Sequence, residues 1–118
     1  MKVLLVDDSA FMRNMIKEVI KDKGHEIAEA GDGDQAIEKT KEFSPDIIFL
    51  DVVMPNKNGV DALKEIKKTN KDVHVVMCTS VGGQQKIIDE AVSAGASDFI
   101  VKPFNQEDIL SAIESASK

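Results

Sequence analysis

Five short apolar runs alternate with longer segments of helical period along the whole chain. The runs occupy residues 3–6, 26–30, 47–50, 73–78 and 99–101. In the segments between them, apolar residues recur three and four positions apart, which is the spacing of one face of a helix. Strands that alternate with helices in this way predict a parallel sheet joined by right-handed crossovers. We therefore predict an α/β fold of the (βα)5 type, with a doubly wound, five-stranded parallel sheet.

The composition of each run predicts its place in that sheet. Four of the runs, all except residues 26–30, are apolar apart from His74, as expected of strands that helices cover on both faces. Residues 26–30 alternate polar with apolar side chains, which is typical of a half-exposed edge strand. Ser9 is a candidate N-cap for the first helix and Gly24 a candidate C-cap that ends it.

Length and charge narrow the class of protein. The 118 residues fit one compact domain, which we expect to span 1–118. A net charge of -6 argues against nucleic acid as a partner, because clustered positive charge supplies most of that affinity. No apolar stretch approaches the roughly 20 residues of a membrane span. The single cysteine, Cys78, suits a reducing compartment and predicts a small buried side chain. We expect a cytoplasmic protein.

Polar side chains follow the predicted strands at their carboxyl ends. In a parallel sheet these ends share one edge, where ligands of open α/β sheets bind. Side chains far apart in the sequence should therefore converge there. They are Asp7 and Asp8 after the first strand, Asp51 after the third, Thr79 and Ser80 after the fourth, and Lys102 after the fifth.

This set of side chains points to phosphoryl chemistry. Clustered carboxylates stay ionised only if a cation sits among them, and Mg²⁺ prefers such hard oxygen ligands together with a phosphate. A carboxylate such as Asp51 is also a competent nucleophile toward phosphorus. Mg²⁺, the Lys102 ammonium and the Thr79 hydroxyl could each neutralise one phosphoryl oxygen. Each residue alone has a structural explanation, such as a helix N-terminus for Asp8 or a turn for Asp51. Their joint arrangement favours a site.

The surrounding motifs resemble the receiver-domain family of two-component signalling, and most of all its single-domain chemotaxis regulators. The resemblance covers the whole chain and implies a flavodoxin-like sheet in the order 2-1-3-4-5. Its motifs are Val6-Asp7-Asp8-Ser9, Leu50-Asp51-Val52-Val53-Met54-Pro55 with Gly59, Thr79, and Gly95-Ala96 followed by Val101-Lys102-Pro103-Phe104.

The resemblance also implies a role for each residue. Asp51 matches the phosphoacceptor, while Asp7, Asp8 and the backbone carbonyl of Val53 match the groups that hold Mg²⁺ together with Asp51. Thr79 and Lys102 match the hydroxyl and ammonium that contact the phosphoryl group. Phe99 matches the switch aromatic, which acts together with Thr79. The Lys102-Pro103 bond is expected to be cis.

The implied partners are proteins. A histidine kinase of the CheA type would supply the phosphoryl group, and the surface of the fourth helix, fifth strand and fifth helix would bind an output partner. That partner would be a flagellar or archaellar motor switch or an adaptor protein. The resemblance implies a monomer that catalyses only its own phosphorylation and dephosphorylation, with no direct contact to nucleic acid or membrane.

Three positions depart from the family pattern. Phe99 lacks the hydroxyl of the tyrosine often found there, so any switch must rest on packing. Ser80 stands where a small apolar residue is common, which leaves Thr79 as the expected hydroxyl. Val53 and Val81 are apolar beside the acceptor, and we expect them to hinder an attacking water and slow self-dephosphorylation.

Other functions remain open from the sequence. A single-domain phosphorelay intermediate would carry the same residues. A small Mg²⁺-dependent phosphatase with an aspartate nucleophile would need a second acid two positions after the first, where this chain has Ser9. A flavin-binding module is disfavoured, since no phosphate-cradling loop follows the first strand and the chain has no Trp or Tyr.

Overall fold

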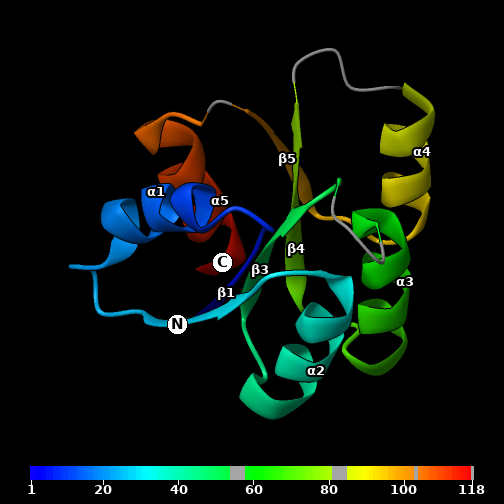
Figure 1. The fold of residues 1–118 in the computed structure, drawn as a ribbon, viewed down its shortest axis with the longest axis horizontal. Coiled ribbons are helices and arrows are strands. Elements are labelled where there is room, and N and C mark those ends of the chain that lie inside the picture. The colour runs from blue at the N-terminus through cyan, green and yellow to red at the C-terminus, as the bar shows by residue number, and fades with distance from the viewer. Residues whose placement is uncertain (54–57, 81–84, 103, 118) are drawn as a thin grey trace.

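The structure is a computed structural model that describes residues 1–53, 58–80, 85–102 and 104–117, and Ser80 by its backbone alone. Strands and helices alternate along the chain, as the sequence predicts (Figure 1). The strands are β1 (Lys2–Val6), β2 (Glu26–Ala30), β3 (Ile47–Asp51), β4 (His74–Ser80) and β5 (Asp98–Lys102). The helices are α1 (Ala10–Ile20), α2 (Gly33–Phe43), α3 (Gly59–Thr69), α4 (Gln85–Ser93) and α5 (Gln106–Ser117).

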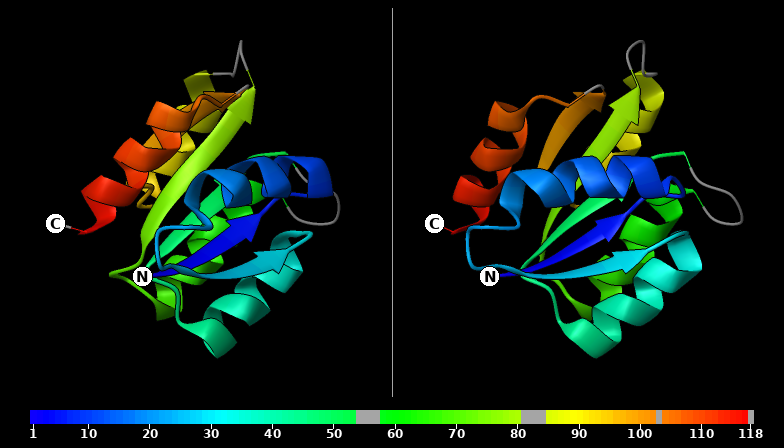
Figure 2. Two further views of the ribbon diagram at one scale, coloured as in Figure 1. Left: turned by 90° about the vertical axis from the view of Figure 1, so that its left-hand side faces the viewer. Right: turned by 60° about the vertical axis from the view of Figure 1, so that its left-hand side comes forward.

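The strands form one parallel sheet in the order β2-β1-β3-β4-β5, which confirms the predicted fold class and strand order. Helices α1 and α5 cover one face, while α2, α3 and α4 cover the other (Figure 1). All strands point the same way, so their carboxyl ends share one edge of the molecule (Figure 2).

Two apolar clusters lie on opposite faces of the sheet because successive strand residues point to opposite sides. In β1, Val3 and Leu5 pack with α1 and α5, whereas Leu4 and Val6 pack with α2 and α3. Cys78 is buried as predicted, and burial raises the pKa of its thiol well above the usual range.

Local capping sets where the helices begin. The Ser9 hydroxyl accepts a hydrogen bond of 3.3 Å from the Met12 N–H, so the predicted N-cap of α1 is confirmed. The predicted end of α1 at Gly24 is wrong, since α1 ends at Ile20. Residues 21–24 form turns instead, and Gly24 takes a φ of 81° that favours glycine.

Two strand predictions also need correction. The predicted fourth strand stops at Cys78, but β4 continues to Ser80 because Thr79 and Ser80 pair with Val101 and Lys102. The prediction that β5 is covered on both faces is wrong, since Val101 is 51% exposed. The sheet order makes β5 an edge strand like β2, and helices cover an edge strand less completely than a central one. The edge position predicted for β2 is confirmed.

Within the described residues, no helix is both long and apolar enough to span a membrane.

Candidate functional site

Strand alternation brings three charged side chains to the same side of the sheet. Phe49 packs with the α1 and α5 layer, and Asp51 lies two residues later on β3. Ile100 packs in the same layer, and Lys102 lies two residues later on β5. Asp7 continues the alternation of β1, and its N–H donates to the Ala30 carbonyl of β2. The period of two therefore places Asp7, Asp51 and Lys102 above one layer, where that layer ends.

Lys102 joins the two buried acids. Its Nζ lies 3.1 Å from Asp7 Oδ2 and 3.0 Å from Asp51 Oδ1. Asp7 and Asp51 are each 5% exposed, so both carboxylates lie largely outside bulk water. Asp8 is exposed beside them, and carboxylate oxygens of Asp7, Asp8 and Asp51 all lie within 4.8 Å of one another. Of the side chains that the sequence predicts to converge at this edge, Asp7, Asp8, Asp51 and Lys102 do meet.

Burial and charge act in opposite directions on this group. Burial raises the pKa of Asp51, and the nearby charge of Asp7 raises it further, while the Lys102 ammonium and the Val53 N–H oppose both. Burial by itself would lower the pKa of Lys102, but its contacts with Asp51 and Asp7 outweigh burial and raise it. Among the described residues, three carboxylates therefore meet one lysine ammonium at this site.

The donor set fits a divalent cation. Three carboxylates provide the hard oxygens that Mg²⁺ prefers, and exposed Asp8 leaves a side open to the hydrated ion. A cation there would also offset the repulsion between the acids. The Val53 backbone lies beside them, and its N–H bonds to the Asp51 carboxylate. The role of the Val53 carbonyl stays a prediction.

The two predicted switch residues share the other face of the sheet. Thr79 pairs with Val101 and follows the alternation of Val75 and Met77, which pack with α3 and α4. Phe99 is half-buried and packs against that same cluster. The structure thus places Thr79 and Phe99 on one face and Asp51 with Lys102 on the opposite one. Pro103, with the predicted cis bond, and Val81 lie outside the described residues.

Three contributors to the geometry have no role assigned from sequence. Gly59 brings α3 against the backbone that follows β3, and its N–H donates to the Val52 carbonyl at 2.8 Å. Arg13 donates to the main-chain carbonyl of Asp7. Glu29, on edge strand β2, binds Arg13. A charged residue within the predicted edge strand is the only sequence signal for this contact.

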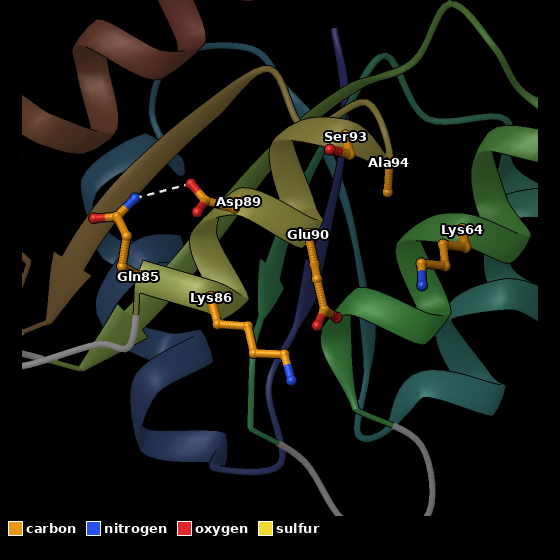
Figure 3. Close-up of a pocket in the computed structure, with 7 residues that line it drawn as sticks. All are labelled: Lys64, Gln85, Lys86, Asp89, Glu90, Ser93 and Ala94. Carbon is orange, nitrogen blue, oxygen red and sulfur yellow. Dashed lines mark hydrogen bonds between the residues drawn. The ribbon is translucent and has the colours of Figure 1, made fainter.

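A separate hollow lies elsewhere on the described surface. It lies between α3 and α4, where Lys64 faces Lys86 and Glu90, and Gln85 donates to Asp89 at 2.9 Å (Figure 3). Asp7, Asp8, Asp51 and Lys102 take no part in its lining. Its mixed, exposed charges are those of a crevice between two surface helices.

A five-stranded α/β sheet with clustered acids and a lysine at its carboxyl edge is the architecture of a receiver domain. The response regulator receiver domain family matches residues 3–114, so the chain belongs to that family. It is 48% identical to the chemotaxis protein CheY of Thermotoga maritima over 118 residues, which are 99% of this chain and 98% of that protein.

Further relatives agree with this assignment. The chain is 50% identical to the chemotaxis protein CheY of Bacillus subtilis over 113 residues, covering 95% of this chain and 93% of that protein. The solved structure of Vibrio cholerae chemotaxis protein CheY4 superposes with a TM-score of 0.90 at 32% identity, covering 98% and 97% of the two chains. The chain is a CheY-like receiver domain of two-component signalling, which confirms the resemblance drawn from its motifs.

Proposed function

We propose that this chain is a stand-alone response regulator, a single domain over 1–118, whose Asp51 accepts a phosphoryl group from a histidine kinase of the CheA type. The observation that carries the proposal is the contact of Lys102 with both Asp51 and Asp7 beside exposed Asp8. It combines a nucleophilic carboxylate, a fixed positive charge and an acidic group suited to Mg²⁺.

Each residue of the site has a part in the transfer. A carboxylate oxygen of Asp51 attacks phosphorus, the bond from phosphorus to the donor imidazole nitrogen breaks, and that nitrogen keeps the electron pair. The Lys102 ammonium, 3.0 Å from Asp51 Oδ1, stabilises charge on the phosphoryl oxygens, and the Thr79 hydroxyl donates to another oxygen. Asp7, Asp8, Asp51 and the Val53 carbonyl would hold Mg²⁺. When bound, Mg²⁺ neutralises developing negative charge.

Phosphorylation would change the conformation of the α4, β5 and α5 surface. Thr79 and Phe99 lie on the α3 and α4 side of the sheet, so movement of the Thr79 hydroxyl toward a phosphoryl group would free space for Phe99. Such a shift biases two existing conformations. Val92 on α4 and Val101 on β5 are 56% and 51% exposed, which supports a protein partner on the α4, β5 and α5 face. We propose a motor switch or adaptor of the flagellar or archaellar system, and a cytoplasmic monomer.

The proposal is tested by intact mass after incubation with acetyl phosphate and Mg²⁺. We expect one phosphoryl adduct on the wild type and none on Asp51→Asn. Asp61→Asn, at an exposed acid in the first turn of α3, is the matched control and should be labelled like the wild type. An adduct of equal yield on Asp51→Asn would refute the assignment of the acceptor.

A turnover assay distinguishes a response regulator from a Mg²⁺-dependent phosphatase. The wild type is incubated with a chromogenic phosphate ester and Mg²⁺, and we expect no sustained release of phosphate. Turnover that continues beyond one equivalent would favour an enzyme. A phosphorelay intermediate would instead pass its label from Asp51 to a histidine protein in a second incubation.

A further inference from the structure

Arg13 of α1 links Asp7, at the carboxyl ends of the strands, to Glu29 on the outer strand β2. Its Nη1 donates to the main-chain carbonyl of Asp7. Its Nε lies 2.9 Å from Glu29 Oε1 on β2. One planar guanidinium therefore spans two elements, which a lysine ammonium cannot do with the same geometry. The Arg13 side chain is only 19% exposed.

Glu29 holds the guanidinium in place. Its second oxygen, Oε2, lies 2.6 Å from Lys17 Nζ, one helical turn after Arg13 on α1. The hydrogen bond from Lys17, together with the Arg13 contact, lowers the pKa of Glu29 against the effect of burial. Glu29 is thus a charged, doubly held anchor at neutral pH, and it restricts the Arg13 side chain.

Asp7 is held through each of its polar groups by a different part of the fold. Its N–H donates to Ala30 and its carbonyl accepts from Arg13. Its Oδ1 accepts from the Ser9 N–H at 2.9 Å, and its Oδ2 contacts Lys102 at 3.1 Å. The Asp7 carbonyl belongs to the planar peptide group that includes the Asp8 nitrogen and the Asp8 Cα atom. Fixing this carbonyl therefore also fixes the direction in which Asp8 leaves the strand.

We propose that Arg13 is a positioning residue for the divalent cation. It anchors the Asp7–Asp8 peptide, and so holds the two carboxylates that would bind Mg²⁺. This inference rests on the proposed function, since it assigns Arg13 a part in that same metal site. Groups that orient metal ligands typically change affinity by about 10–100-fold when they are removed.

The charge of Arg13 makes a competing prediction. A positive charge near the acids repels Mg²⁺, so its removal alone would tighten binding. Anchoring predicts weaker binding when Arg13 is lost. Arg13→Lys separates the two effects, because it keeps the charge but cannot reproduce the paired contacts with Asp7 and Glu29.

The experiment measures Mg²⁺ binding calorimetrically to the metal-free full chain, because the absence of Trp and Tyr leaves intrinsic fluorescence uninformative. The variants are Arg13→Met and Arg13→Lys, with Lys17→Met as the matched control. Lys17→Met removes a cation from the same helix and the same carboxylate, but it leaves the contact between Arg13 and Asp7. Hydrogen exchange at the Ser9 amide, whose acceptor is Asp7 Oδ1, gives a readout without metal.

We expect about tenfold weaker Mg²⁺ binding for both Arg13 variants, faster exchange at Ser9, and wild-type affinity within about twofold for Lys17→Met. Urea unfolding identifies variants that have simply lost their fold, and exchange at Ser9 is compared with exchange of buried β3 amides. Wild-type or tighter binding by Arg13→Met would overturn the inference while leaving the proposed function intact. Failure of the wild type to bind Mg²⁺ would overturn both.

Discussion

Gly59 at the start of α3 touches the backbone of Asp51 so closely that no side chain fits between them. A Cβ atom at Gly59 would lie 2.1 Å from the Asp51 carbonyl oxygen and 2.8 Å from the Val52 Cα. Both atoms belong to the backbone, so neither can rotate away. This close approach packs α3 directly beneath the proposed acceptor and makes glycine necessary at this position.

Gly59→Ala should therefore destabilise the protein by about 2–4 kcal/mol, since the overlap can be relieved only by displacing α3 or the end of β3. Urea unfolding measures the loss. Gly31→Ala is the control, because its nearest atoms belong to the Gln35 side chain at 3.7 Å, and we expect a change below about 1 kcal/mol. Equal stability of the two variants would contradict the close approach.

Lys102→Met should leave the electrostatic repulsion between Asp7 and Asp51 without compensation. It leaves Asp7 and Asp51 buried without their cation, which we expect to cost about 3 kcal/mol near neutral pH. Burial already raises the pKa of Asp51. Acidification therefore protonates Asp51 and should reduce the loss of stability that Lys102→Met causes. Unfolding by urea at about pH 7 and about pH 4.5 tests this sign.

Lys17→Met is the control for that change. Lys17 also contacts a carboxylate, at 2.6 Å, but it is 35% exposed, and an ion pair so close to water contributes less than about 1 kcal/mol. If Lys102→Met were no less stable than Lys17→Met at neutral pH, the buried pair would have no net effect on stability.

His74 should make stability fall on mild acidification. Its Nε2 is buried without a hydrogen-bond partner among the described residues, and burial lowers its pKa from the usual 6.5. The unfolded chain then binds the proton first, so the stability due to neutral His74 is complete above about pH 6.5 and is lost as pH falls toward its folded pKa. His74→Val should flatten stability against pH between about 7.5 and 5.5.

His25 provides the comparison for that measurement. Its pKa is also lowered, first by burial and then by the N-terminal charge. His25→Gln should therefore remove part of the dependence of stability on pH. If the variant that lacks both histidines shows the same dependence of stability on pH as the wild type, other groups control that dependence.

Val53→Asn should shorten the lifetime of the phosphorylated protein. The Val53 side chain is 73% exposed, two residues after Asp51, the proposed acceptor, and an apolar group there cannot hydrogen-bond an attacking water. An amide can orient that water, so we expect severalfold faster loss of label, followed by intact mass over time. Val53→Leu, which keeps an apolar side chain, should stay close to the wild type. A lifetime in Val53→Asn as long as the wild type's would refute the idea.

Local patterns in the sequence were sufficient for the fold class and for the acids and the lysine that meet at one edge of the sheet. Short apolar runs and helical spacing indicated the alternation of strands and helices, because both periodicities depend on neighbouring residues alone. Acids and a lysine at strand ends indicated one shared edge, because parallel strands align their carboxyl ends. The strand order came from the family resemblance.

Tertiary structure decided what depends on distant partners. Lys102 meets Asp7 across 95 residues of sequence, and Arg13 meets Glu29 on another strand. No local pattern reports such distances. The exposure of Val101 and the extension of β4 to Ser80 follow from the position of β5 at the edge and from pairing between strands. Sequence specified the chemistry of the side chains, while the packing of distant elements fixed which of them touch.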